Sequence, residues 1–448
     1  MSAGAKAQGR QRSLAEGLAT AFLGAPAWDE PSLVQRAAVA LGRRPRWLGP
    51  CVREVLEAYP RPPVDARRAL AAVVLGTSRF PRRRVPRVAV WQPEATRMGR
   101  APWSVAPLDD VAALAALLDE DMERLLWLAD PRGYQRRAPE GPLHHYRSTW
   151  LPRPGRAPRL LEAPLPRLKG TQRTVLRAVL DAVPPHEAAH GYVRGRSAVT
   201  HAAAHTGHRL VLTLDLQAFF ASVSAARVYG VFRSCGYPEA VAHLLTGLCT
   251  VATPLAVLRG APAGPGLAAL RRELATPHLP QGAPTSPALA NLVAQGLDRR
   301  LAGLAARYGL AYTRYADDLC FSGRALPRLL VTAVGDVVRD EGFEVQEAKT
   351  RLRGRSQRQL VTGVVVNEHT APRRADYDAL KALLHDARLH GCEVAGRRHP
   401  HHDLPSHVLG RIAWVAALHP ERGARLRAAF DEVQRAQAVA DSGRRRIR

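Results

Sequence analysis

Two neighbouring carboxylates are the residues of this sequence that most clearly indicate chemistry. Asp317 and Asp318 lie between two apolar runs. These runs, 310–314 and 319–321, are typical of short strands joined by a tight turn. Like charges this close are unfavourable unless a cation lies between them, and Mg²⁺ prefers carboxylate oxygens. In this context the pair predicts a divalent-cation site, although an Asp-Asp pair on its own is usually a solvated turn.

A third acid completes a set of carboxylates suited to phosphoryl transfer. Asp215 ends an apolar run, 209–214, and is followed by the aromatic pair Phe219-Phe220. With Asp317 it would provide ligands for two metal ions, one activating a hydroxyl and the other holding a triphosphate and its leaving pyrophosphate. These residues by themselves indicate a metal-dependent nucleotidyl transferase that works on a nucleic-acid template.

A loop sequence, Pro-Gln-Gly-Ala-Pro-Thr-Ser-Pro over 280–287, could contact the nucleotide. Gly282 lets backbone approach a ligand closely, and Gln281 offers a donor and an acceptor to a sugar or base edge. Without the acids, this segment would indicate nothing more than a loop.

Charge and composition narrow the class of protein. The 448 residues contain 65 Lys and Arg against 39 Asp and Glu, a net charge of +26, which favours a polyanionic partner and nucleic acid first. Hydrophobic residues make up 46%, which excludes wholesale disorder. No apolar run approaches a membrane helix and the start resembles no signal peptide, so we expect a cytoplasmic protein without a membrane partner. The five scattered cysteines fit a reducing compartment.

The elements that must position these residues mix helices with short strands, so the predicted fold class is α+β. Apolar periodicity predicts a small helical module over 32–75, after a frayed basic tail over 1–14. Residues 76–107 are rich in Pro and Arg without periodicity, which is typical of a linker. A further helix is predicted from Leu108 toward Trp127, with acids in its first turn.

Strands and a C-terminal helical region complete the pattern. We expect a strand over 209–214, a strand, turn and strand over 312–322, and another strand over 364–367. Residues 254–266 are predicted to form a loop or an insertion, and the C-terminal region after residue 367 to be basic and mostly helical. The His-rich run 398–402 is expected to be an exposed polar loop and not a metal site, because no Cys or third spaced ligand accompanies it.

Taken in order, these segments resemble the sequence blocks of reverse transcriptases. The blocks correspond to 158–173 and 190–197 (fingers), Asp215 (motif A), 280–287 (motif B), Tyr315-Ala-Asp-Asp318 (motif C), and Gly342-Phe343 with Lys349-Thr350 (motif D). The resemblance covers roughly residues 108 to 430. It implies a right-hand polymerase of fingers, palm and thumb with an N-terminal helical extension.

The same resemblance implies domain limits. They are an N-terminal helical extension and basic Pro/Arg-rich linker over 1–107, fingers over 108–209 with part of 234–278, a palm with the catalytic motifs over 210–367, and a thumb that binds RNA and duplex over 368–448.

Residue roles are also implied. Asp215, Asp317 and Asp318 would be catalytic and would hold two Mg²⁺ ions, or Mn²⁺ in their place, with the backbone carbonyl of Leu216. The implied nucleotide-binding residues are Arg159, Phe220, Gln281, Gly282 and Lys349.

Within this nucleotide-binding set the chemistry of each residue differs. Arg159, and less directly Arg153, would grip the triphosphate, because guanidinium forms forked hydrogen bonds to phosphate. Phe220 would exclude a 2′-hydroxyl, and its neighbour Phe219 would pack in the core. Alternatively, Phe219 would lie at the sugar and Phe220 in the core. Lys349 would protonate the departing pyrophosphate or remain a solvated lysine.

Two further segments resemble bacterial retron reverse transcriptases. Val361-Thr362-Gly363 matches their Val-Thr-Gly tripeptide, and His201 to His205 is similar to their Asn-Ala-x-x-His block, with His in place of Asn. These five positions, His201, His205, Val361, Thr362 and Gly363, are therefore RNA-recognition candidates. The resemblance implies an RNA-directed DNA polymerase that copies a structured noncoding RNA into branched, RNA-linked single-stranded DNA (msDNA), using dNTPs and holding an RNA–DNA hybrid, in anti-phage defence with a retron effector protein.

Other interpretations stay open at this point. A group II intron-like or other stand-alone bacterial reverse transcriptase would share the same blocks. An RNA-dependent RNA polymerase would more often carry Gly-Asp-Asp in motif C. A non-enzymatic, basic RNA-binding protein with a polymerase fold is disfavoured by the intact acids, because buried unpaired acids are costly without a metal.

Overall fold

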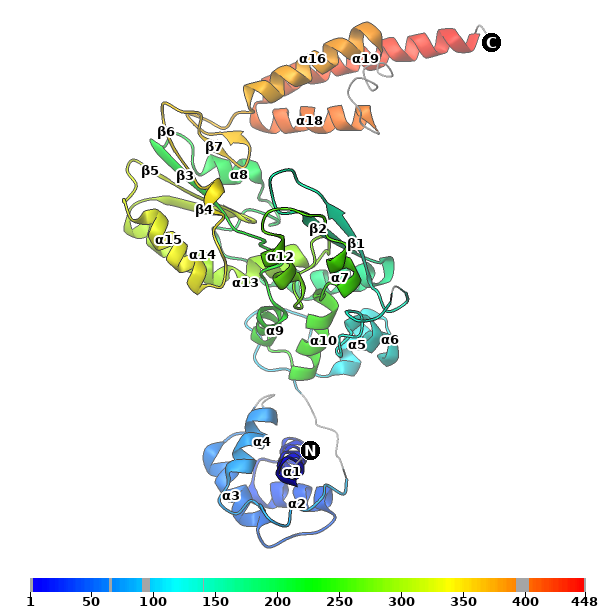
Figure 1. Ribbon diagram of the computed structural model, residues 1–448, viewed down its shortest axis with the longest axis vertical. Helices are drawn as coiled ribbons and strands as arrows, with labels where there is room; N and C mark the ends of the chain where they lie inside the picture. Colours follow the sequence, from blue (N-terminus) through cyan, green and yellow to red (C-terminus); the bar gives the residue numbers. More distant parts are fainter. Residues whose placement is uncertain (1–2, 64–66, 91–96, 140, 392–402, 447–448) are drawn as a thin grey trace. The chain divides into compact units, whose positions relative to one another are not determined.

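The computed structural model describes residues 3–63, 67–90, 97–139, 141–391 and 403–446 (Figure 1). The chain divides into two compact units. The first unit is Met1–Val183 with Ser224–Ser286, and the second is Pro184–Val223 with Pro287–Arg448. Helices and short antiparallel sheets occur together, which confirms the predicted α+β class. Among the residues described, no helix combines the length and apolarity needed to cross a bilayer.

The first unit begins with four helices that share a core of their own. They are α1 (Ala3–Leu23), α2 (Glu30–Leu41), α3 (Leu48–Ala58) and α4 (Arg67–Gly76). Leu14, Leu18 and Phe22 of α1 are buried among them, spaced to face one side of a helix. The tail predicted over 1–14 is therefore wrong from Ala3 onward, whereas the helical module predicted over 32–75 is confirmed.

The rest of the first unit combines helices with one hairpin. Its elements are α5 (Val111–Leu118), α6 (Met122–Ala129), β1 (Tyr146–Leu151), β2 (Arg159–Pro164), α7 (Pro166–Ala178), η1 (Leu180–Ala182), α9 (Ala225–Ser234), α10 (Glu239–Cys249), α11 (Leu255–Arg259) and α12 (Leu267–Leu274). The single helix predicted from Leu108 to Trp127 is two, because Asp119 ends α5 in the left-handed region at φ 54° and Asp121 caps α6. A short helix, α11, lies inside the predicted loop 254–266.

The second unit contains a four-stranded antiparallel sheet. Its strands, β3 (Leu210–Asp215), β4 (Ala311–Tyr315), β5 (Asp318–Gly323) and β6 (Arg351–Gly354), are ordered β4-β5-β3-β6. The neighbouring elements are α8 (Ala198–Ala203), α13 (Ser286–Val293), α14 (Gln295–Arg307), α15 (Leu330–Asp340) and η2 (Glu347–Lys349). The strands predicted over 209–214 and 312–322 are confirmed.

A small hairpin and three helices end the second unit (Figure 1). They are β7 (Leu360–Val361), β8 (Val364–Val365), α16 (Arg374–His390), α18 (Leu404–Leu418) and α19 (Pro420–Arg446). Buried residues such as Leu384, Ile412 and Phe430 join the three helices into one core. Leu418 of α18 packs in a second cluster with Val361 and neighbouring residues of the hairpin. The helical C-terminal region is confirmed, and the His-rich run 398–402 lies outside the described residues.

Candidate active site

The three predicted acids lie at one end of the four-stranded sheet. The register of β3 and β5 places Asp215 directly opposite Asp318. One residue further on, the backbone N–H of Leu216 donates to the carbonyl oxygen of Asp317 at 2.9 Å. Two strands about 100 residues apart in sequence thereby hold the acids together through main-chain hydrogen bonds.

The turn between β4 and β5 has a strained backbone. Tyr315 pairs with Asp318, so only Ala316 and Asp317 form the loop. Ala316 has φ 54°, in the left-handed region, which costs a non-glycine residue roughly 1–2 kcal/mol. Gly191 packs against this turn so closely that an added Cβ would lie 2.6 Å from the backbone nitrogen of Ala316. A glycine is therefore required at position 191 for the turn to keep its place.

Electrostatics at the carboxylates are dominated by burial and like charge. Burial, together with the charges of Asp317 and Asp215, raises the pKa of Asp318 to about 7. The Nζ atom of Lys349 lies 2.6 Å from both carboxylate oxygens of Asp215 and partly offsets this repulsion. Lys349, predicted to act on pyrophosphate, is thus an ion-pair partner of Asp215 here.

The chemistry of this donor set fits a hard divalent cation. Asp215, Asp317 and Asp318 present only carboxylate oxygens, and their mutual repulsion is what a bound cation would relieve. No group of three or more His, Cys, Asp or Glu side chains in the described chain is arranged to hold an ion as it stands. The ammonium group on Asp215 occupies part of the space that metal ligation would need.

The aromatic pair after Asp215 is divided between interior and surface. Phe219 is buried, with its ring 5.6 Å from that of Phe343. Phe220 is partly exposed, and its ring lies 6.2 Å from that of Tyr192. Tyr192 is 58% exposed and also lies 6.4 Å from the ring of Tyr315. Tyr192 is therefore a surface aromatic at this site whose only signal in the sequence is its place after Gly191.

A buried polar network behind the turn was not predicted. Arg314, fully buried in β4, donates to both carboxylate oxygens of Asp298 at 2.8 and 2.6 Å. The same guanidinium donates to the side chain of Asn291 and to the carbonyl oxygen of Ala316, each at 3.0 Å. Asn291 in turn donates to the carbonyl oxygen of Gly191 at 2.9 Å. The network thus links the backbone of Ala316 and of Gly191 to α13 and α14. In the sequence, the one feature that points to this network is an arginine inside an apolar strand.

The remaining nucleotide-binding candidates belong to the first unit. The N–H of Glu162 donates to the carbonyl oxygen of Gln281 at 2.9 Å, which anchors the 280–287 loop to β2. Gly282 has φ 135°, and a Cβ there would lie 3.1 Å from the carbonyl oxygen of Glu162, so this glycine is required by its backbone. Arg159 is exposed at the start of β2.

A buried ion pair supports this loop from behind. Glu162 and His278 are both buried and lie 2.9 Å apart, and Thr253 donates to the second oxygen of Glu162 at 2.7 Å. Burial alone would lower the pKa of His278, but the charge and hydrogen bond of Glu162 outweigh it and raise that pKa.

The RNA-recognition candidates divide by exposure. His201 and His205 are fully buried, and both ring nitrogens of His205 are hydrogen-bonded, to Ser322 and to Thr313. The imidazoles of His201 and His205 and the side chain of Val361 are thus not presented to an RNA, so direct RNA contact by these three side chains is not what the structure shows. Thr362 is partly exposed and Gly363 exposed, both with positive φ, at the tip of the β7–β8 hairpin.

Comparison with known proteins agrees with the sequence blocks. Residues 152–366 match the family described as reverse transcriptase (RNA-dependent DNA polymerase). The chain is 42% identical over 304 residues to the retron Mx65 reverse transcriptase of Myxococcus xanthus, covering 66% of each chain. It is 41% identical to the retron Mx162 reverse transcriptase of the same organism, over 58% of this chain and 54% of the relative. It is 32% identical to the retron Ec86 reverse transcriptase of Escherichia coli, over 52% of this chain and 66% of the relative. The chain therefore spans about two thirds or less of the length of these relatives.

Removing the charge of Asp298 should destabilise the second unit strongly. The variant Asp298→Asn leaves the buried guanidinium of Arg314 without its ion partner, which typically costs about 3–5 kcal/mol. Urea unfolding followed by circular dichroism measures the loss. The matched control is Asp340→Asn, which breaks an exposed Arg300–Asp340 pair and should change stability little. Equal unfolding midpoints for the two variants would contradict the structural importance of the network.

The Glu162–His278 pair predicts how stability depends on pH. Because the pKa of His278 is raised in the folded chain, its stabilising contribution is complete below about pH 6.5 and is lost as pH rises through the folded pKa. In the variant Glu162→Gln the carboxylate charge is gone, so burial determines the pKa of His278 and lowers it. The loss of stability above pH 6.5 should therefore disappear in this variant. Urea midpoints between pH 5.5 and 9 test this, and parallel profiles for the two proteins would contradict it.

Proposed function

We propose that the chain, which belongs to the reverse transcriptase (RNA-dependent DNA polymerase) family through residues 152–366, is the RNA-directed DNA polymerase of a retron. The observation that carries the proposal is the register of β3 and β5, which sets Asp215 opposite Asp318 beside the turn that carries Asp317. The names of the relatives, all retron reverse transcriptases, support the retron assignment.

The proposed architecture is the right-hand arrangement of polymerases. The four-stranded sheet of the second unit would form the palm, within 210–367. The helices α16, α18 and α19 would form the thumb, within 368–448. Residues 108–209 with part of 234–278 would form the fingers, and 1–107 the N-terminal extension.

The carboxylates would perform the catalytic work. Asp215, Asp317 and Asp318, with the backbone carbonyl of Leu216, would hold two Mg²⁺ ions, for which Mn²⁺ could substitute. When bound, these ions would supply Lewis-acid activation of the attacking hydroxyl and neutralise charge on the triphosphate. The protein's own part is to fix the acids by main-chain pairing, so that their repulsion is not relieved by moving apart. The ammonium group of Lys349 would be displaced from Asp215 by metal binding, and Lys349 would then carry a proton at Nζ near the leaving group.

Selection of the sugar of the nucleotide would rest on Phe220. The ring of Phe220, which is partly exposed and lies 6.2 Å from that of Tyr192, would close the space where a 2′-hydroxyl would lie. Arg159, Gln281 and Gly282 keep the roles implied by their sequence blocks, with Arg159 on the triphosphate and the loop on the sugar or base.

The biological setting follows from the retron assignment. The template would be a structured noncoding RNA, the substrates dNTPs and the product a single-stranded DNA branched from that RNA. A role in anti-phage defence with an effector protein is part of the same proposal. The hairpin tip, where Thr362 is partly exposed and Gly363 is exposed, is the RNA-recognition candidate that remains at the surface.

Replacing both turn acids should abolish DNA synthesis. Asp317→Asn with Asp318→Asn removes metal ligands, so we expect at least about a hundredfold loss of synthesis, since such ions contribute several kcal/mol to the transition state. Extension of a primed RNA template in vitro and recovery of RNA-linked DNA from cells with the complete locus both measure it. RNA binding should persist in the double variant. Undiminished synthesis would contradict the metal assignment, and unlinked DNA from the wild type would contradict the retron assignment alone.

Shortening Phe220 should relax sugar discrimination. In Phe220→Ala the space beside Tyr192 opens, and we expect incorporation of ribonucleotides relative to deoxynucleotides to rise by about tenfold or more. Competing single-nucleotide incorporation assays measure the ratio. The control Phe220→Tyr keeps the ring and should keep the discrimination. An unchanged ratio in Phe220→Ala would return this residue to a packing role.

A further inference from the structure

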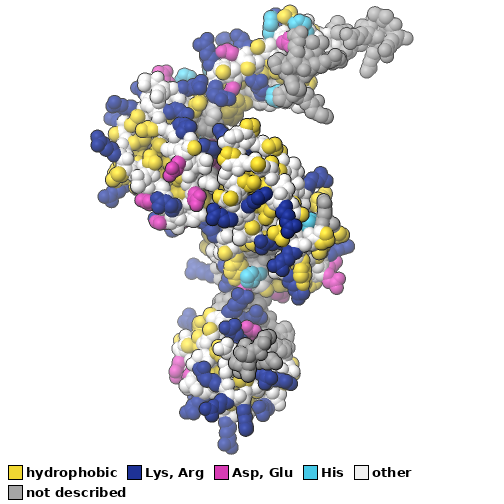
Figure 2. Space-filling model, viewed as in Figure 1, with side chains coloured by type: hydrophobic (Ala, Val, Ile, Leu, Met, Phe, Trp, Pro, Cys, Tyr) yellow, Lys and Arg dark blue, Asp and Glu magenta, His cyan; other side chains and the backbone are white. Residues whose placement is uncertain are grey.

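The N-terminal helices carry a large excess of positive charge. Residues 1–90 contain 16 Lys and Arg against six Asp and Glu. Figure 2 shows Lys and Arg gathered over the α1–α4 part of the molecule, with few acidic side chains among them. The candidate active site uses none of these residues, so the excess needs an explanation of its own.

Several of the acids in this region already have structural partners. Asp29 caps α2 by accepting from the N–H of Ser32 at 2.8 Å. Glu30, at the start of α2, pairs with Arg53 at 2.8 Å, and Glu54 accepts from the N–H of Ser78. Glu30 and Arg53 lie at the N-terminal end of α2, whereas Arg43 and Arg44 follow its C-terminal end.

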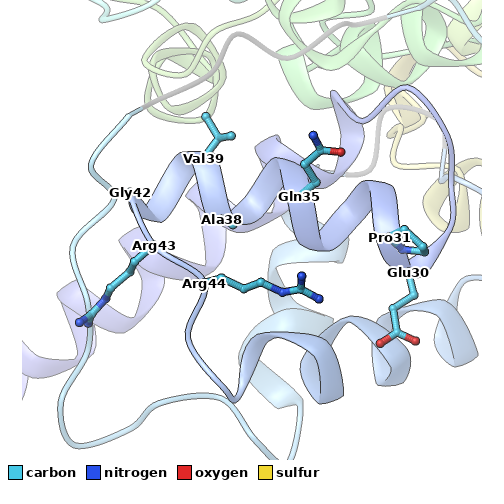
Figure 3. Close-up of a pocket in the computed structure, with 8 residues that line it drawn as sticks. All are labelled: Glu30, Pro31, Gln35, Ala38, Val39, Gly42, Arg43 and Arg44. Atoms are coloured by element: carbon cyan, nitrogen blue, oxygen red, sulfur yellow. The ribbon is translucent and has the colours of Figure 1, made fainter.

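Six exposed arginines form what we name the arginine surface. They are Arg43 and Arg44, which follow α2, and Arg82, Arg83, Arg84 and Arg87, which follow α4. None of the six forms an ion pair with any other residue that the structure describes. Figure 3 shows Arg43 at one end of a pocket along α2 and Glu30 at the other, with the side chain of Arg44 extended between them.

Backbone contacts hold the two groups of arginines on one face. The side chain of Gln11 in α1 donates to the carbonyl oxygen of Arg82 at 3.0 Å. The N–H groups of Ala89 and Val90 both donate to the carbonyl oxygen of Ala40 near the end of α2. Gly17 of α1 is buried beneath Val88, and a Cβ at this glycine would lie 2.5 Å from that side chain. The segment 82–90 therefore folds back over α1 and the end of α2, beside Arg43 and Arg44.

Guanidinium groups without carboxylate partners are suited to phosphate. They form forked, charge-assisted hydrogen bonds with phosphate oxygens. A protein partner is disfavoured because the only large apolar side chains exposed in the described part of α1–α4 and the 82–90 segment are Val39 and Val90, whereas protein interfaces are anchored by buried aromatic and apolar groups.

The burial of the aromatic residues indicates whether the partner is a duplex or a single-stranded nucleic acid. Single-strand binding relies on exposed aromatic rings for base stacking. Here Phe22 and Phe80 are buried, and Trp28, Trp47 and Tyr59 pack against the helical core, with Trp28 donating to the carbonyl oxygen of Tyr59. The described part of this region thus offers phosphate contacts without a stacking platform, which is the mode used for double-stranded RNA.

We propose that the arginine surface binds the phosphate backbone of double-stranded RNA, as a site separate from the carboxylates. The inference deepens the proposed function, because stems of the structured template RNA are the duplexes it would hold. It concerns binding alone, so it can fail while the polymerase assignment stands.

The test compares two charge-matched double variants of the full chain. Arg83→Gln with Arg84→Gln removes two charges from the arginine surface. Arg53→Gln with Arg61→Gln removes two exposed charges outside it, at the N-terminal end of α2 and after α3. The probes are a blunt 20-base-pair RNA duplex, the DNA duplex of the same sequence and one RNA strand alone, each titrated between 50 and 200 mM salt.

The expected result is specific to one variant and one probe. Arg83→Gln with Arg84→Gln should lower the salt dependence of RNA-duplex binding by about 1.5 in log K against log salt, and weaken binding roughly tenfold at low salt. The control variant should bind like the wild type, and both should extend a short primed RNA template normally. Equal losses in the two variants, or a loss as large for the single strand or the DNA duplex, would overturn the proposal. Lost extension with unchanged duplex binding would overturn it as well.

Discussion

Repulsion among three carboxylates is the constraint around which the second unit is arranged. The pairing of β3 with β5 sets Asp215 against Asp318, and the turn adds Asp317. Burial, and then the charges of these two neighbours, raise the pKa of Asp318 to about 7. Side chains on a loose loop would relax such crowding by rotating or drifting apart. Here the main chain is hydrogen-bonded on both sides of Asp215, through Leu216 to Asp317 and through Gln346 to the carbonyl oxygen of Asp215 itself. The main-chain hydrogen bonds of the sheet therefore hold the three carboxylates close together, although their charges repel one another.

Support for this arrangement comes from a polar interior. Burying Arg314 and Asp298 carries a desolvation cost that an apolar pair would avoid. What the pair contributes is a fixed geometry. The planar guanidinium of Arg314 has five donors and contacts Asp298, Asn291 and the carbonyl oxygen of Ala316 at once. Leucine or methionine at 314 could fill the volume without fixing that carbonyl oxygen. The left-handed backbone of Ala316 is thereby held in a conformation that alanine seldom adopts.

The sequence predicted those parts of the site that local patterns encode. An apolar run ending in an acid and an Asp-Asp pair between two strands both depend on nearest neighbours, and both were found where expected. The Arg314–Asp298 pair was not predictable, because its partners meet only when α14 packs on β4. The same limit applies to His205, whose motif gives no sign that Ser322 and Thr313 enclose its ring. The tail over 1–14 was mispredicted for another reason: small polar residues hid the spacing of Leu14, Leu18 and Phe22.

The order in which the chain visits its two units has a consequence for biosynthesis. The chain leaves the first unit at Val183, returns at Ser224 and leaves again at Ser286. During synthesis from the N-terminus, β3 therefore emerges long before its partners β5 and β6, and must wait unpaired for more than 100 residues. The α1–α4 helices draw their core from one continuous stretch near the start of the chain. In a ribosome-bound chain the basic α1–α4 helices could thus fold while the four-stranded sheet is still incomplete.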